Sequence, residues 1–181
     1  MTAAAGMSRT LRGGLRTLRE ALRREDGATT VEFAMIAVPF VALLVAMTQT
    51  ALVFFAGQVL QSAASEAARL VMTGQAQGMT AGQFQQAVCT NAGGFFTCSQ
   101  LQVNVQTFTS FASATGANPI QNGKLNTSGF GFSPGKPGQI EVVQVFYPWP
   151  LGTDLLGLHL TDVNGDSHLL AATAVFRNEP Y

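Results

Sequence analysis

The stretch GATTVEFAMIAVPFVALLVAMTQTALVFFA, residues 27 to 56, decides the fold of this chain. No charged side chain occurs from Phe33 to Ser65, and the block from Phe33 to Ala56 is mostly apolar. At about 1.5 Å per residue, this block forms a helix of about 36 Å, which can cross a hydrocarbon core of about 30 Å with some tilt. The alternative is a buried core helix, but such helices are rarely so long and apolar on every face. We therefore predict a transmembrane helix over residues 28–56.

Glu32 stands at the start of the apolar block, where a carboxylate in or near hydrocarbon costs several kcal/mol. A secretory signal has a shorter hydrophobic region followed by a small-residue cleavage site, whereas here the small residue and the acid precede the apolar block. Cleavage after Gly27 would make Glu32 the fifth residue of the mature chain. A Gly followed at plus five by Glu, ahead of an apolar helix, resembles the type IV prepilin pattern.

Within that superfamily, GATTVEFA at residues 27–34 is similar to the start of TadE-like pseudopilins, the minor pilin-like proteins of the Tad (Flp pilus) machinery. LQSAASEAAR at 60–69, FYPWPL at 146–151 and ATAVFRNEPY at 172–181 also resemble this family. The resemblance implies cleavage between Gly27 and Ala28 by a prepilin peptidase. It also implies a structural role, without catalysis or a cofactor, in building or priming an Flp-type pilus or a related secretion filament. The implied partners are the peptidase, other pilin-like subunits and the Tad secretion machinery.

The resemblance further implies that Glu32 acts in assembly. A carboxylate in a low dielectric is stabilised by a nearby cation, and the new amino terminus of a neighbouring subunit is one available partner. The alternative is that Glu32 lies at the headgroup level, where an acid suits the amino-terminal end of the helix dipole.

Charge is distributed unevenly along the chain. Residues 1–26 carry six arginines against three acids, whereas the residues after Glu32 carry four basic against six acidic side chains. The positive-inside rule therefore predicts a single-pass protein of the bacterial inner membrane, with a cytoplasmic leader over residues 1–27 and a periplasmic carboxyl-terminal part. Leucines at helical spacing among these arginines predict an amphipathic leader helix on anionic lipid: Leu11, Leu15, Leu18 and Leu22. A nucleic-acid-binding arm is the competing interpretation, and the adjacent span disfavours it.

The helical pattern continues beyond the apolar block. Apolar residues at helical spacing predict that residues 57–74 extend the same helix outside the membrane, so that one helix runs from about Thr29 to Thr73. Gly74 is suited to cap its carboxyl-terminal end. A second, short helix is predicted over Ala81 to Thr90, with Thr80 as its N-cap.

Residues 75–181 are expected to form one disulfide-bonded sheet domain. Cys89 and Cys98 lie close together in a segment predicted to be outside the cytoplasm, which favours one disulfide, and the family resemblance includes such a pair. Strands are predicted over 101–108, 140–147, 155–160 and 167–176, with a hairpin turn at Asn164-Gly165 and a long loop over 109–138. The predicted fold is α+β and pilin-like, with three or four antiparallel strands packed on the outer half of the long helix.

Trp149, Arg177 and Glu179 are candidates for a surface that docks another pilin-like subunit, and ordinary packing at a sheet edge is the alternative. The rival for the whole chain is a signal-anchored periplasmic enzyme or binding protein whose start mimics a prepilin. That rival predicts an uncut leader and a ligand pocket in the sheet domain.

Three patterns suggest catalysis or metal binding, and each fails on its chemistry. Gly131 to Gly135 matches G-x-S-x-G, but Pro134 lacks the backbone N–H that an oxyanion hole needs. Cys89 and Cys98 with His159 and His168 are too widely spaced for a usual zinc site. Residues 162–166 contain three calcium-type ligands, but their glycine is fourth instead of sixth. We therefore expect no metal site and no enzyme activity.

Overall fold

The computed structural model describes residues 25–116, 118–151, 161, 163 and 167–181. The leader helix predicted around Leu11 to Leu22, the strand predicted over 155–160 with His159, and the turn at Asn164-Gly165 lie outside these residues. The chain divides into two compact units, Met1–Ala46 and Met47–Tyr181, and each is described by itself.

One long helix, α2, runs from Glu25 to Met72 and begins in the first unit. The prediction of a single continuous helix from about Thr29 to Thr73 is therefore confirmed. Pro39 lies inside it, where its missing N–H removes one helical hydrogen bond. Apolar side chains along the first half of α2 face outward, for example Phe33 and Met35, which are 72% and 73% exposed.

The second unit contains a three-stranded antiparallel sheet in the order β1-β4-β5. β1 is Gln102–Phe108, β4 is Ile140–Pro150 and β5 is Ser167–Arg177. β4 pairs with β1 from Phe146 to Ile140 and with β5 along its whole length. The long helix and this small sheet confirm the predicted α+β fold class.

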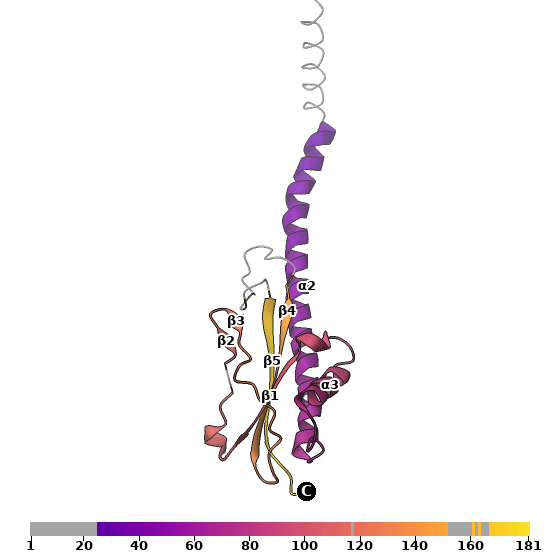
Figure 1. Cartoon of the computed structure of the whole chain (residues 1–181). Coiled ribbons are helices and arrows are strands. Elements are labelled where there is room, and N and C mark those ends of the chain that lie inside the picture. Colours follow the sequence, from indigo (N-terminus) through magenta and orange to yellow (C-terminus); the bar gives the residue numbers. More distant parts are fainter. Residues whose placement is uncertain (1–24, 117, 152–160, 162, 164–166) are drawn as a thin grey trace, which may run out of the picture. The chain divides into compact units, whose positions relative to one another are not determined.

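The core of the second unit lies between the sheet and the last turns of α2, and α3 also contributes to it (Figure 1). Residues of α2 in the core recur at helical spacing and most are alanines, which lets the helix backbone approach the sheet closely. Within the second unit, the buried side chains of α2 are Ala56, Leu60, Ala63, Ala64, Ala67, Ala68 and Val71. Opposite them lie alternate residues of the strands, including Val105, Val143, Val145 and Ala172.

The second helix, α3, runs from Ala81 to Asn91. The hydroxyl of Thr80 accepts a hydrogen bond from the backbone N–H of Gln83, whose side chain accepts from the N–H of Thr80 in return. This capping box satisfies two helix-start donors and confirms Thr80 as the N-cap. Phe84 and Val88 are fully buried, which fixes α3 against the core.

Residues 109–138 contain more structure than the predicted loop. A short hairpin joins β2, Ile120–Gln121, to β3, Lys124–Leu125, through Asn122 and Gly123, which both have positive φ as a two-residue type I′ turn requires. The later segment lies along the outer edge of β1, because the N–H of Val105 donates to Gly131 O and the N–H of Ser133 donates to Val105 O. The free edge of β1 is therefore covered in its centre.

β4 is longer than predicted, because it continues through Pro148 to Pro150. A proline cannot donate a ladder hydrogen bond and is normally excluded from a central strand. Here β1 pairs with β4 only as far as Phe146, so the proline-containing end of β4 has β5 as its one neighbour among the described strands. The hydrogen bonds between β1 and β4 have therefore ended before the first proline.

Candidate functional site

The predicted cleavage site lies within the first turns of α2. Gly27 is exposed and has no positive φ, and beyond the backbone of its own helix a Cβ added to it would meet no described atom within 4 Å. A glycine inside a helix costs about 0.5 to 1 kcal/mol relative to alanine, because its backbone loses more entropy on folding. The helix alone therefore gives no reason for glycine at this position.

Glu32 is exposed on α2, one turn beyond Gly27. It is followed by a shell of exposed apolar residues on several sides of the helix, which continues to Phe55. α2 is the one helix among the described residues that is long and apolar enough to cross a membrane. This composition and exposure fit a single-pass membrane protein. Its orientation and the boundaries at residues 27, 56 and 74 stay predictions.

Cys89 and Cys98 form the predicted disulfide, with their Cα atoms 5.6 Å apart. Cys89 is in α3, and Cys98 begins the short 3-10 helix η1, Cys98–Gln100, just before β1. Gly93 and Gly94 both adopt positive φ, which reverses the chain between the two cysteines. The alternative of a zinc site is excluded for this pair, because both sulfurs are used in the disulfide.

Trp149 lies in a cluster of aromatic rings. It stacks on Phe95 with ring centroids 5.6 Å apart and contacts Phe96 edge-on at 6.2 Å. Tyr147 contacts both Phe96 and Trp149. Phe95 also meets Phe55 of α2 at 5.5 Å. Trp149 is therefore fixed by rings from the disulfide loop and from its own strand.

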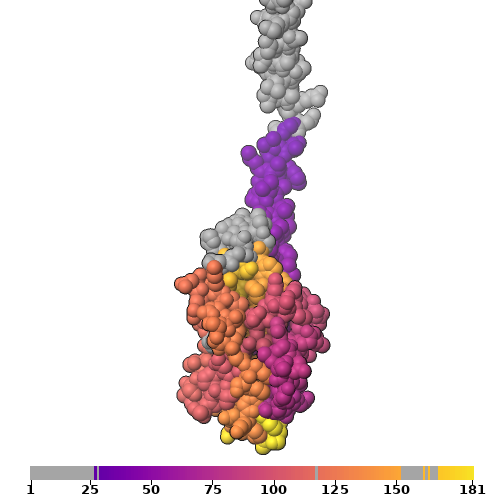
Figure 2. All heavy atoms as spheres, in the orientation of Figure 1, coloured from indigo at the N-terminus to yellow at the C-terminus, as the bar shows by residue number. Residues whose placement is uncertain are grey.

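Arg177 and Glu179 help to attach the carboxyl-terminal residues to the far end of the sheet. The Arg177 Nε–H donates to Gly138 O over 2.8 Å, and the N–H of Glu179 donates over 3.0 Å to the carbonyl of Met72 at the end of α2. Figure 2 shows the yellow carboxyl-terminal residues beside the magenta residues that follow α2. Both side chains are exposed, although their backbone is tied down.

The strand register separates Trp149 from Arg177. Trp149 pairs with His168, whereas Arg177 pairs with Ile140 at the other end of β4. The three residues proposed as one docking surface therefore lie in two places on the second unit. Whether either place contacts a subunit stays a prediction.

Glu141 was missed by the sequence reasoning. It is fully buried on β4, where Thr107 donates a 3.0 Å hydrogen bond to its Oε1, while Oε2 has no hydrogen-bond partner among the described residues. Burial raises the pKa of this carboxyl to about 7, against the hydrogen bond from Thr107, which lowers it. The signal was present in the alternation of β4, since Glu141 has the same parity as the core residues Val143 and Val145.

Ser133 of the G-x-S-x-G match does not lie on a turn between a strand and a helix. Its N–H is bonded to Val105 O, and its carbonyl accepts a hydrogen bond from the Thr107 hydroxyl over 3.2 Å. The next regular element is the strand β4. This environment lacks the geometry of a nucleophile elbow.

Residues 27–69 match the model of a protein family that is described as TadE-like protein. No curated protein and no solved structure matches the chain. The matched segment contains Gly27 and Glu32 and ends within the part of α2 that packs on the sheet. The resemblance predicted from GATTVEFA is thereby confirmed, and residues 27–69 form a TadE-like segment.

Proposed function

We propose that this protein is a minor pseudopilin of a Tad/Flp-type pilus or a related secretion filament, in which it acts structurally in assembly or priming. The observation that carries the proposal is the family match over residues 27–69, which begins at Gly27 and covers the exposed apolar part of α2. A prepilin peptidase cleaves between Gly27 and Ala28, and the mature chain begins at the apolar helix.

The exposure of the apolar helix supports this proposal. Val31, Ile36 and Val41 are 55%, 71% and 54% exposed, and they point in different directions around the helix. In water, each exposed apolar side chain forgoes roughly 1.5 to 3 kcal/mol of burial energy. Lipid before assembly and neighbouring pilin-like helices after it both provide the missing apolar environment.

The position of Gly27 supports cleavage there. Neither packing nor backbone conformation among the described residues requires glycine at residue 27. Recognition by a peptidase would explain the glycine, which the fold does not. The disulfide fits an oxidising compartment for the sheet domain, which agrees with the periplasmic side proposed from the charge distribution.

The decisive experiment is the intact mass of the mature protein after expression with and without the prepilin peptidase of the system. We expect a start at Ala28 that depends on the peptidase. Gly27→Leu should block this cleavage. Gly57→Leu is the matched control, because Gly57 is also a helical glycine with no atom within 4 Å of an added Cβ. An intact amino terminus under both conditions would favour the rival, a signal-anchored protein.

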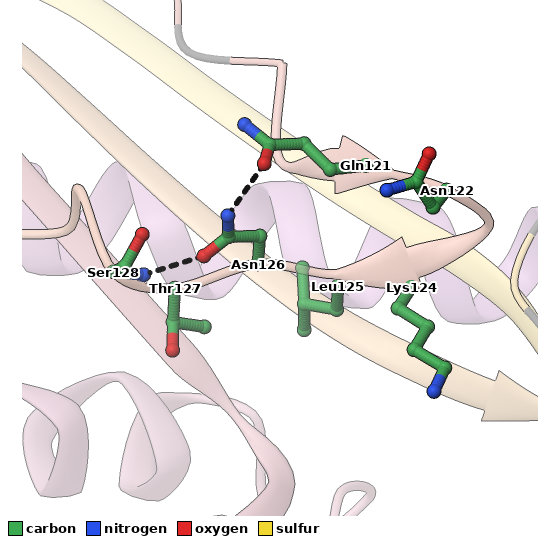
Figure 3. Close-up of a pocket in the computed structure, with 7 residues that line it drawn as sticks. All are labelled: Gln121, Asn122, Lys124, Leu125, Asn126, Thr127 and Ser128. Carbon is green, nitrogen blue, oxygen red and sulfur yellow. Dashed lines mark hydrogen bonds between the residues drawn. The ribbon is translucent and has the colours of Figure 1, made fainter.

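One hollow of the described residues, of about 760 Å³, does not have the features of the ligand pocket that the rival predicts. It is lined only by residues between 121 and 128 of the β2–β3 hairpin. Figure 3 shows the Asn126 side chain engaged with Gln121 and with the N–H of Ser128, while Lys124 points away from them. These polar groups stabilise the turn and do not converge on a common point, as groups in a ligand site do.

The two exposed ends of the β4–β5 pair remain candidates for contacts with other pilin-like subunits. Arg177 and Glu179 are exposed at one end, and Trp149 lies at the other. Double substitution of Arg177 and Glu179 by alanine should reduce crosslinking to partner subunits. Unchanged crosslinking would assign both residues to packing at the sheet edge.

A further inference from the structure

Three aromatic rings form a continuous partly exposed surface at one end of the second unit. Phe55 of α2 is 57% exposed and contacts Phe95 of the disulfide loop, which is 39% exposed. Phe95 stacks on Trp149 of β4 with an angle of 13° between the rings. We call Phe55, Phe95 and Trp149 the aromatic patch. It joins a helix, a loop and a strand that are distant in sequence.

The aromatic patch is fixed from behind. Phe96 and Tyr147 are buried, with exposures of 4% and 5%, and their rings lie 4.7 Å apart. The disulfide closes the loop that carries Phe95, and Gly93 and Gly94 allow that loop to turn sharply. The exposed rings therefore have little freedom to fold inward and cover one another.

The patch is continuous with the apolar surface of α2. Leu52 and Phe54, on the neighbouring turn, are 47% and 70% exposed. Phe55 is the penultimate residue of the segment predicted to span the membrane, and two ring contacts of 5.5 and 5.6 Å connect it to Trp149. The polar interfacial layer on each side of a bilayer is about 5 to 8 Å thick. Trp149 is therefore close enough to Phe55 to reach this layer where the line between the two rings runs along the bilayer surface.

The sequence around the patch carries no charge. No acidic or basic residue occurs between Arg69 and Lys124 or between Glu141 and Asp154, and these two intervals contain Phe95 and Trp149. Lys136, Arg177 and Glu179 are exposed at the opposite end of the β4–β5 pair. Contact of these two uncharged intervals with lipid would bury no charged side chain.

We propose that the aromatic patch lies in the headgroup region of the bilayer, so that this end of the sheet domain rests on the lipid surface beside its own anchor. Trp and Tyr favour this layer because their rings are apolar and their N–H or O–H group can remain hydrated. The proposal rests on the membrane-spanning role of α2 in the proposed function. It extends that function by giving the globular domain a second, direct contact with lipid.

Lipid fits the patch better than a second copy of the chain does. An interface with a second copy would also include residues further from the anchor. The exposed rings instead lie next to the last turn of the predicted span. A group of exposed rings beside a membrane helix matches the aromatic belts of membrane proteins. The occupant is therefore the acyl and headgroup boundary of the bilayer.

Trp149 is the single tryptophan of the chain, so its fluorescence reports on the patch without any substitution. The full chain is reconstituted at a low protein-to-lipid ratio in phosphatidylcholine vesicles whose acyl chains are brominated either near the headgroup or deep in the bilayer. We expect shallow bromine to remove more than half of the Trp149 emission and deep bromine to remove less. Iodide in the water should quench Trp149 weakly.

Two reporter variants complete the test, each made with Trp149→Phe. Phe111→Trp places the reporter at an exposed site just beyond β1, at the end of the sheet where Phe108 pairs with Ile140, and it should be quenched by iodide and not by brominated lipid. Phe54→Trp places it on α2 and should be quenched by brominated lipid.

The outcomes separate this proposal from the one on which it rests. Lipid quenching of the Phe54→Trp reporter without lipid quenching of Trp149 would overturn the contact of the patch while leaving the span intact. Trp149 shielded from iodide but untouched by lipid bromine would assign the patch to a protein partner and would also overturn the proposal. Failure of the Phe54→Trp reporter to sense lipid would overturn the span itself.

Discussion

The ring of Tyr181 occupies the space in which a side chain on residue 74 would begin, since an ideal Cβ on Gly74 would lie 2.6 Å from Tyr181 Cγ. Gly74 has a φ of 79° and ends α2 in the left-handed conformation. The Tyr181 hydroxyl accepts a 3.0 Å hydrogen bond from the side-chain amide of Gln77. The carboxyl-terminal Tyr181 thus packs against the end of α2 at a position where only glycine leaves room for its ring.

Gly74→Ala should destabilise the second unit for two reasons. Alanine in the left-handed region costs about 1 to 2 kcal/mol, and the added Cβ must also displace the Tyr181 ring. The measurement is urea unfolding of the full chain in detergent, followed by circular dichroism.

Gly78→Ala is the matched control, because Gly78 has a φ of 82° but open space around its Cβ. This variant should lose only the stability that alanine costs in the left-handed conformation. Combining Gly74→Ala with Tyr181→Ala should relieve the steric part. Equal losses for Gly74→Ala and Gly78→Ala would show that the tyrosine ring does not restrict residue 74.

Glu141 should make the stability of the fold depend on pH. Its folded pKa is about 7 and its ordinary value is 4.5, so the folded state retains a proton that the unfolded state releases. Stability is therefore greatest below pH 4.5 as far as this group is concerned, and it falls as pH rises from about 4.5 to 7. With about 1.4 kcal/mol per pKa unit, the loss is on the order of 3 kcal/mol.

Glu141→Gln keeps an acceptor for the Thr107 hydroxyl and removes the titration. Its free energy of unfolding should be nearly flat between pH 4.5 and 7 compared with the wild type, and it should exceed that of the wild type at pH 8. Urea unfolding at several pH values measures both quantities. The same slope in both proteins would mean that other groups cause the pH dependence.

Loss of the disulfide should weaken the second unit. The bond joins residues nine positions apart, and in the chain-entropy model such a closure stabilises a fold by roughly 2.5 to 3 kcal/mol. The double variant Cys89→Ser, Cys98→Ser should unfold at a correspondingly lower urea concentration. Reducing agent should shift the wild type to the midpoint of this variant and leave the variant unchanged; an unaltered wild-type midpoint would contradict the prediction.

Gln61 of α2 should help to hold β5 through two hydrogen bonds to one residue. Its Oε1 accepts from the N–H of Thr173 at 3.3 Å, and its Nε2 donates to the carbonyl of Thr173 at 3.4 Å. Gln61→Ala should cost about 0.5 to 1.5 kcal/mol and speed hydrogen exchange at the Thr173 amide. Gln58→Ala, at an exposed position one turn earlier, should change neither quantity.

Glu32→Ala should impair assembly of the proposed filament, because it removes the carboxylate available to the amino terminus of a neighbour. Glu66→Ala is the control, since Glu66 is an exposed acid on the same helix. Pilus counts by electron microscopy and the fraction of processed protein measure the effect. Wild-type assembly by Glu32→Ala would assign Glu32 to a position at the headgroup level.

Features set by local chemistry could be predicted from the sequence. The extent of α2 follows from a helical pattern that ends at Gly74, and α3 follows from Thr80 and the apolar spacing behind it. The family of residues 27–69 was visible in a short motif at a specific position. In each case, the information lies within a few turns of chain.

Features that depend on contacts between distant segments could not be predicted. Pro148 suggested the end of β4, and it is tolerated because β1 stops pairing at Phe146. Asn122-Gly123 is as clear a turn signal as Asn164-Gly165, but the glycine-rich surroundings concealed it. The separation of Trp149 from Arg177 follows from strand register, which neither residue encodes.

The pairing of Gln61 with Thr173 also has a consequence for the order of folding, because these two residues are 112 positions apart. The alanine face of α2 is fully covered only after β4 and β5 have been synthesised and paired, so an early fragment that ends at β1 can bury it only in part. Contacts of such long range slow folding, since the loop must close before they form. The sheet domain should therefore remain open to chaperones and to proteolysis until β5 reaches the helix.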